Sequence, residues 1–198
     1  MLKCMPIVAT LIIVGALAFG APEARAHCDG LDGPVVTAAR EALESGDVRR
    51  VLIWVAEEDE AEIRAAFDET ISVRDLSPDA RTLADRYFFE TVVRIHRAGE
   101  GAPFTGLKPA GRDLGPAIPA ADIAVESQSP EALEQLLTDE VLRGLRAQFE
   151  AVMEKKDFAP EDVTAGRAFV EAYVPFIHYV ERIYDAAVQK PEGHFDSH

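Results

Sequence analysis

The chain has 198 residues, 48% of them hydrophobic, and 35 Asp and Glu against 20 Lys and Arg give a formal net charge of −15. This length suits one domain of ordinary size, and the apolar fraction is too high for a disordered chain. The negative charge argues against nucleic-acid binding, because no excess of Lys or Arg is available to neutralise phosphates. Two cysteines are too few for a disulfide scaffold or a four-thiolate zinc site.

Residues 1–26 have the pattern of a secretory signal peptide. Lys3 supplies the positive start, residues 7–18 are almost wholly apolar, and a small-x-small cleavage site ends at Ala26. The apolar stretch is too short for a comfortable membrane span. We therefore expect an exported protein, periplasmic or secreted, with no membrane span after cleavage. Removing 26 of the 198 residues leaves 172, with a formal net charge of −16 and a single cysteine.

The rest of the chain predicts helices and no strands, because apolar residues recur at helical spacing between Pro, Ser, Asp and Gly boundary signals. We expect helices over residues 34–45, from 47 onwards, from 59 onwards, and over 78–98, 120–128, 131–156 and 160–189. Residues 99–119 contain five Gly and four Pro and predict a long loop. We expect Phe104, Leu107 and Ile118 to pin this loop to the core. The prediction is an all-α bundle of four to five main helices, forming one domain over residues 27–190 and followed by a flexible tail over 191–198.

Signal cleavage would place four potential metal ligands within two residues. The amine and imidazole of His27 and the amide and thiol of Cys28 suit Ni²⁺ or Cu²⁺, because both ions accept tetragonal nitrogen and sulfur donors. His27 and Cys28 are therefore candidate ligands of Cu or Ni. Because the free amine exists only after signal cleavage, the ion would be bound outside the cytoplasm. The alternative is a Cys28 that is simply buried, or that joins two chains, in a protein without metal.

Residues 27–33, which we call the hook, read His27-Cys28-Asp29-Gly30-Leu31-Asp32-Gly33. This segment resembles the mature N-terminus of nickel superoxide dismutase, His-Cys-Asp-x-x-Cys-Gly. The resemblance implies that His27 and Cys28 supply the ligands of a redox-active nickel ion. Asp32 stands in place of the second cysteine ligand of that family and is a further candidate ligand. A superoxide dismutase-like enzyme is therefore an alternative function.

A second resemblance covers more of the chain. It is carried by the hook with the following Pro34, Tyr87-Phe88-Phe89-Glu90-Thr91, His96-Arg97-Ala98-Gly99-Glu100-Gly101-Ala102-Pro103, Gly106-Leu107-Lys108-Pro109 and Phe176-Ile177-His178-Tyr179-Val180-Glu181. These segments resemble an uncharacterised family of exported bacterial proteins, domain of unknown function 6448. The resemblance implies one helical domain and supplies no activity.

Two histidines on the predicted helices are candidates to complete a metal site. His96 lies on the apolar side of the helix over 78–98. His178 lies among aromatic residues of the last helix, and Glu181 follows at i+3, a spacing that lets both bind one ion. An N-terminal histidine joined by either helical histidine would form a three-nitrogen site that suits copper.

Three charged residues are weaker candidates. Glu90 lies one helical turn from two arginines, which is typical of a solvated ion-pair face. Glu171 shares one side of the last helix with His178. Lys108, in the Gly/Pro-rich loop, is placed to guide an anion in an otherwise acidic protein. A metal-free structural or partner-binding helical module is the third possible function.

Overall fold

A computed structural model describes residues 27–190 of the chain. The expected signal peptide over 1–26 and the expected tail over 191–198 lie outside the described residues. Within residues 27–190 the chain forms helices and no strands, which confirms the all-α prediction. In the same range, no helix combines the length and the hydropathy that a membrane span requires.

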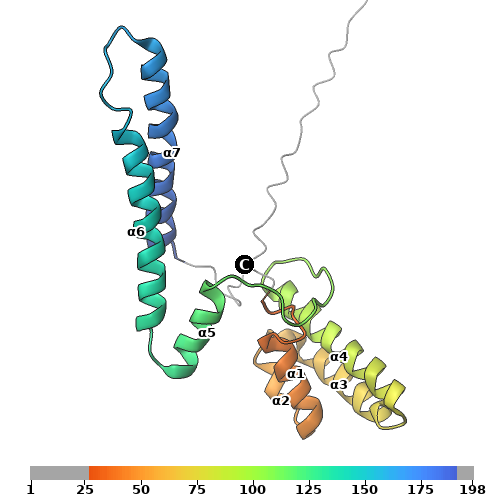
Figure 1. Cartoon of the computed structure of the whole chain (residues 1–198). Helices are drawn as coiled ribbons and strands as arrows, with labels where there is room; N and C mark the ends of the chain where they lie inside the picture. Colours follow the sequence, from red (N-terminus) through yellow and green to blue (C-terminus); the bar gives the residue numbers. More distant parts are fainter. Residues whose placement is uncertain (1–26, 191–198) are drawn as a thin grey trace, which may run out of the picture.

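The first half of the described chain folds into a packed group of helices: α1 (Pro34–Ser45), α2 (Arg49–Leu52), α3 (Glu60–Arg74) and α4 (Pro78–Gly99). A 3₁₀ turn, Glu57–Asp59, leads into α3. α1 and α3 both pack against α4, and α2 packs against α1 (Figure 1). α4 is therefore the central element of the group.

The ends of these helices follow local sequence signals. Pro34 occupies the first turn of α1, and Gly46 ends that helix in the left-handed region with φ 69°. Ser77 caps α4, since its hydroxyl accepts a hydrogen bond from the Ala80 amide at 3.1 Å. The helix expected from residue 47 onwards is only four residues long, α2 (Arg49–Leu52), and the nearby apolar residues Val51 and Val55 are both buried.

One apolar core joins α1, α3 and α4. Phe67 and Phe88 meet edge to face, with their ring centroids 5.6 Å apart. Arg74 of α3 donates two hydrogen bonds to the Asp85 carboxylate of α4, at 2.8 and 3.0 Å. This bidentate ion pair fixes the register of the two helices at the border of the core.

The Gly/Pro-rich loop between α4 and α5 runs back across the hook. The Lys108 amide donates to the Asp29 carbonyl at 2.8 Å, and the Leu31 amide donates to the Lys108 carbonyl at 3.0 Å. Phe104 and Leu107 pack against the core, as the sequence predicts, whereas Ile118 lies in the first turn of α5 (Ala117–Ser127) and is not among the residues packed there. The loop therefore holds the hook close to the C-terminal end of α4.

The second half of the described chain contains α5 (Ala117–Ser127), α6 (Glu131–Met153) and α7 (Val163–Val188). α6 and α7 pack as an antiparallel pair, which we call the hairpin, and α5 packs against α6. The hairpin stands apart from α1–α4 (Figure 1). On α6, Leu142, Phe149 and Met153 are exposed, although they lie at the helical spacing of an apolar face. Two helices can bury only the stripe that lies between them.

Candidate metal site

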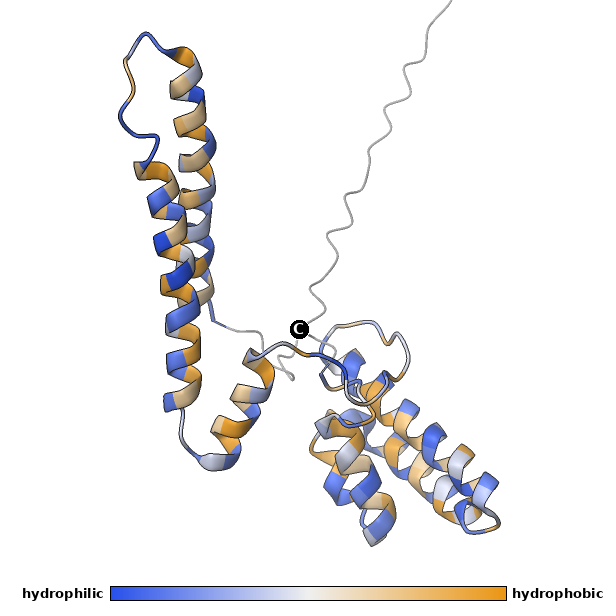
Figure 2. Ribbon diagram, in the orientation of Figure 1, coloured by the Kyte–Doolittle hydropathy of each residue, from blue (hydrophilic) through white to orange (hydrophobic). Residues whose placement is uncertain are grey.

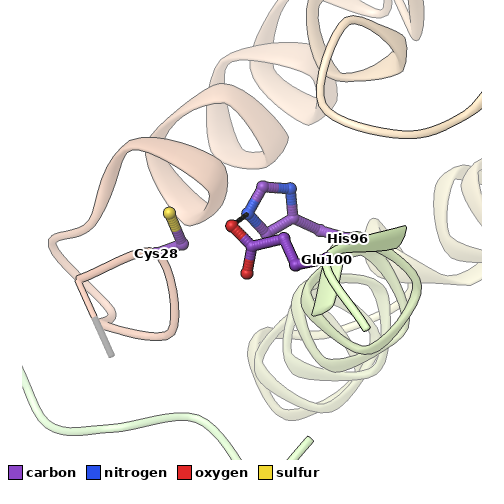
Figure 3. Close-up of side chains that lie close together, drawn as sticks. All are labelled: Cys28, His96 and Glu100. Atoms are coloured by element: carbon purple, nitrogen blue, oxygen red, sulfur yellow. Dashed lines mark ion pairs between the residues drawn. The ribbon is translucent and has the colours of Figure 1, made fainter. Parts of the chain in front are cut away.

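The hook and the end of α4 bring three potential metal ligands together. One ligand atom from each of Cys28, His96 and Glu100 lies within 4.8 Å of the other two (Figure 3). No other trio of His, Cys, Asp or Glu in residues 27–190 reaches this spacing. Bonds of 2.0–2.3 Å in a tetrahedral site place neighbouring ligand atoms roughly 3.5 Å apart. Small side-chain adjustments would therefore close the three ligands around one ion.

The ring of His96 is oriented as in a typical metal-binding histidine. Its Nδ1 lies 2.8 Å from the carbonyl oxygen of Trp54, and because a carbonyl only accepts, the hydrogen is assigned to Nδ1. In the neutral ring this leaves the lone pair on Nε2, which lies 3.6 Å from Glu100 Oε1. A backbone carbonyl bound to the distal ring nitrogen is a common way to fix such a ligand.

A buried arginine links the hook to α4 beside this group. Arg97 donates from Nη1 to Glu100 Oε2 at 2.8 Å. Its Nε lies 3.5 Å from Asp29 Oδ1, and both Arg97 and Asp29 are buried. One guanidinium therefore contacts carboxylates on both ligand-bearing elements and holds Cys28 and Glu100 near each other.

Burial controls the charge of the metal-free site. Desolvation, reinforced by the Glu100 and Asp29 carboxylates, raises the pKa of the Cys28 thiol from 9.0 to about 11. Desolvation also raises the pKa of Asp29, against the opposing effect of Arg97. A divalent cation would deprotonate the thiol and balance the charges of the thiolate and Glu100.

The other two candidates in the hook face a different space. His27 Nε2 lies 3.1 Å from Asp122 Oδ2 of α5. Asp32 Oδ2 accepts a hydrogen bond from the Gly111 amide at 2.6 Å, which lowers the pKa of Asp32. Both side chains line a cavity of about 200 Å³ together with Arg112. The His27 imidazole and Asp32 are thus outside the Cys28 group.

The candidates on α7 are also outside it. His178 Nδ1 lies 3.3 Å from Glu181 Oε2, so the i, i+3 pair forms as the spacing suggests. Both side chains are exposed, and Glu171 is exposed on the same helix. Of the two helical histidines considered from the sequence, the structure brings only His96 to Cys28.

The remaining two candidates have other partners. Glu90 accepts a hydrogen bond from Arg86 Nε at 2.9 Å, the ion pair that its helical spacing predicts. Lys108 donates from Nζ to the Thr105 carbonyl at 3.0 Å. Lys108 also lines a cavity of about 550 Å³ with Arg40, Arg86 and Asp85, and its suggested attraction of anions stays a prediction.

Glu100 is a candidate ligand that the sequence-based prediction missed. The signal was present, since Glu100 follows His96 by four residues and the two share a helix face. Gly99 and Gly101 suggested that the helix had ended, whereas α4 continues through Gly99 and Glu100 is its C-cap. The roles of Asp29 and Arg97 had no local signal, because their contact joins distant parts of the chain.

Most of the described chain matches one family of proteins. The model of a family described as Family of unknown function (DUF6448) matches residues 32–179. The chain belongs to this family. The DUF6448 match includes His96 and Glu100 and begins just after Cys28. No curated protein and no solved structure matches the chain.

Proposed function

We propose that this DUF6448 protein is an exported metal-binding protein that holds Cu or Ni at Cys28, His96 and Glu100. The observation that carries the proposal is the proximity of the Cys28 thiol and the oriented His96 imidazole, which come from segments far apart in the sequence. A thiolate, an imidazole and a carboxylate provide three donors and two negative charges for one divalent ion.

Export supports the choice of ion. Cleavage after Ala26 would add the free amine of His27 and the amide of Cys28 to the three side-chain ligands. Cu²⁺ and Ni²⁺ favour such tetragonal nitrogen and sulfur donors, whereas Zn²⁺ is satisfied by a tetrahedral Cys-His-Glu set. The contact of the His27 imidazole with Asp122 favours the amine of His27, rather than its ring, as the ligand.

The test starts from protein exported with its own signal peptide, with the first residue established by mass spectrometry. We expect close to one equivalent of Cu or Ni by elemental analysis. C28S and H96Q should each weaken binding at least tenfold in a chelator competition, because each removes a ligand. H178Q, at the exposed histidine of α7, is the matched control and should bind as the wild type does. A metal-free wild type, or an H96Q protein that retains full affinity, would contradict the proposal.

A second arm tests the contribution of the N-terminal amine. One extra residue before His27 removes the α-amine from its position while leaving Cys28, His96 and Glu100 unchanged. We expect this extension to weaken Cu and Ni binding and to affect Zn much less. Equal Cu affinity with and without the extension would exclude the amine as a ligand. Superoxide consumption by the metal-loaded protein tests the redox alternative.

A further inference from the structure

The hairpin buries little of its apolar surface. Phe149 and Phe176 pack with ring centroids 5.9 Å apart, and Tyr179 donates to the Val141 carbonyl at 3.1 Å. Gly144 allows this contact, since a Cβ there would lie 2.0 Å from the Tyr179 hydroxyl oxygen. Within α6 and α7, both wholly described, only Val152 and Ala172 are buried.

Large apolar side chains remain exposed on both helices. Ten of them, between 36% and 65% exposed, form what we call the apolar face: Leu142, Phe149, Met153, Val170, Tyr173, Val174, Ile177, Val180, Tyr184 and Val188. On α7, positions 170, 173, 177, 180 and 184 alternate steps of three and four, the spacing of a coiled-coil seam. Figure 2 shows apolar positions along both helices.

The two helices present these residues on the same side of the hairpin. At 100° per residue, the exposed α7 residues are rotated by roughly 130° from the stripe that packs on α6. The same calculation on α6 gives a similar rotation between the stripe that packs on α7 and the exposed residues Leu142, Phe149 and Met153. On both helices the rotation follows the direction in which the chain winds. Because the helices are antiparallel, equal rotations turn both sets towards one side and make the face continuous.

The size of the apolar face matches that of a stable protein interface. From its residue types and exposures, it presents roughly 800 Å² of apolar surface. The largest apolar patch on a typical monomer is about 300–600 Å², and a standard interface buries about 800 Å² per partner. At 100° per residue, Asp185 lies at the border of the face, where interfaces are usually polar, and Glu181 is the one acidic residue of α7 that falls between the apolar positions.

We propose that a second copy of this chain covers the apolar face, so that two hairpins form a two-fold symmetric four-helix bundle. α6 and α7 have 23 and 26 residues and are therefore about 35 and 39 Å long. A hairpin needs two more helices of this length, with matching apolar stripes, to complete such a bundle. A second hairpin supplies both helices. In a two-fold symmetric dimer each apolar face covers the other, so no apolar face is left exposed and the assembly stops at two chains.

Sedimentation velocity of the processed full-length chain tests this proposal. We expect a dimer at micromolar concentrations. V174E/Y184E should raise the dimer dissociation constant at least 100-fold, because it places four carboxylates per dimer in the interface. The matched control is I53E/L83E, at apolar positions outside the hairpin that are more exposed still (74% and 72%), and it should remain dimeric. Far-UV circular dichroism shows whether each variant keeps its helices.

Three results would overturn the proposal. One is a wild-type protein that is monomeric at 100 µM. The apolar face would then be covered by α1–α4 of the same chain or by a different protein. Another is a dimer that survives V174E/Y184E or that I53E/L83E abolishes equally. The last is loss of the dimer in C28S, which would assign it to a disulfide between chains. The metal-binding proposal stands independently, since none of the apolar-face residues contributes a ligand.

Discussion

Gly33 is the position at which a single methyl group would most directly disturb the proposed metal site. Its φ of −74° is open to any residue, so the effect of Gly33→Ala is purely steric. The new Cβ would lie 2.3 Å from the His27 carbonyl oxygen, 3.1 Å from that of Gly30 and 3.4 Å from that of Cys28. An ordinary carbon–oxygen contact is about 3.4 Å, so the hook must move by roughly 1 Å.

That displacement exceeds what a metal site tolerates. Ligand distances in a formed site vary by about 0.2 Å, and disturbing the residues that orient ligands typically costs 10–100-fold in affinity. We therefore expect Gly33→Ala to weaken Cu or Ni binding at least tenfold in a chelator competition. The loss of folding stability should be about 1–3 kcal/mol, from crowding in a packed region.

Gly46→Ala is the matched control at the other end of α1. Gly46 has φ 69°, and an added Cβ would meet no neighbouring atom within 4 Å, so this change strains the backbone without touching the hook. It should destabilise the protein by about 1–2 kcal/mol and leave metal affinity unchanged. Wild-type affinity in Gly33→Ala, or an equal loss in both variants, would refute the steric argument.

Three further predictions concern the buried groups around the site and the core. In the metal-free protein, iodoacetamide should alkylate Cys28 slowly at pH 8 and faster towards its pKa of about 11. The pKa of this thiol in the unfolded chain is near 9, so between pH 9 and 11 the unfolded chain loses the thiol proton before the folded protein does. Urea unfolding should therefore show the full contribution of Cys28 to the free energy of unfolding below pH 9 and its loss between pH 9 and 11. Arg97→Met should destabilise by about 3–5 kcal/mol in the same assay, because Asp29 is left buried without its cation; an effect under about 1 kcal/mol would contradict the buried ion pair. Phe88→Ala, at a fully buried position, should lower the free energy of unfolding by about 3–5 kcal/mol. Leu83→Ala, at an exposed position, should lower it by less than about 0.5 kcal/mol, and equal effects of the two changes would contradict this placement of the core.

Much of the secondary structure was predictable because its determinants are local. Pro34 and Gly46 mark the ends of α1, and Ser77 with Pro78 marks the start of α4. The same local signals misled at Gly99, where a helix-ending residue is still helical and Glu100 completes the turn. Helical spacing likewise identified the apolar residues of α6, but not how many of them a two-helix hairpin leaves exposed.

The sequence by itself determined the helical class, the negative charge and the chemistry available in the hook. It also singled out Cys28 and two equally plausible helical histidines. Only the tertiary structure decided between them, by placing His96 beside Cys28 and His178 in solvent. The physical reason is that periodicity sets which face of a helix a residue occupies. The meeting of hook and α4 depends instead on long-range contacts of Lys108 with the hook and of Arg97 with Asp29, which no local pattern encodes.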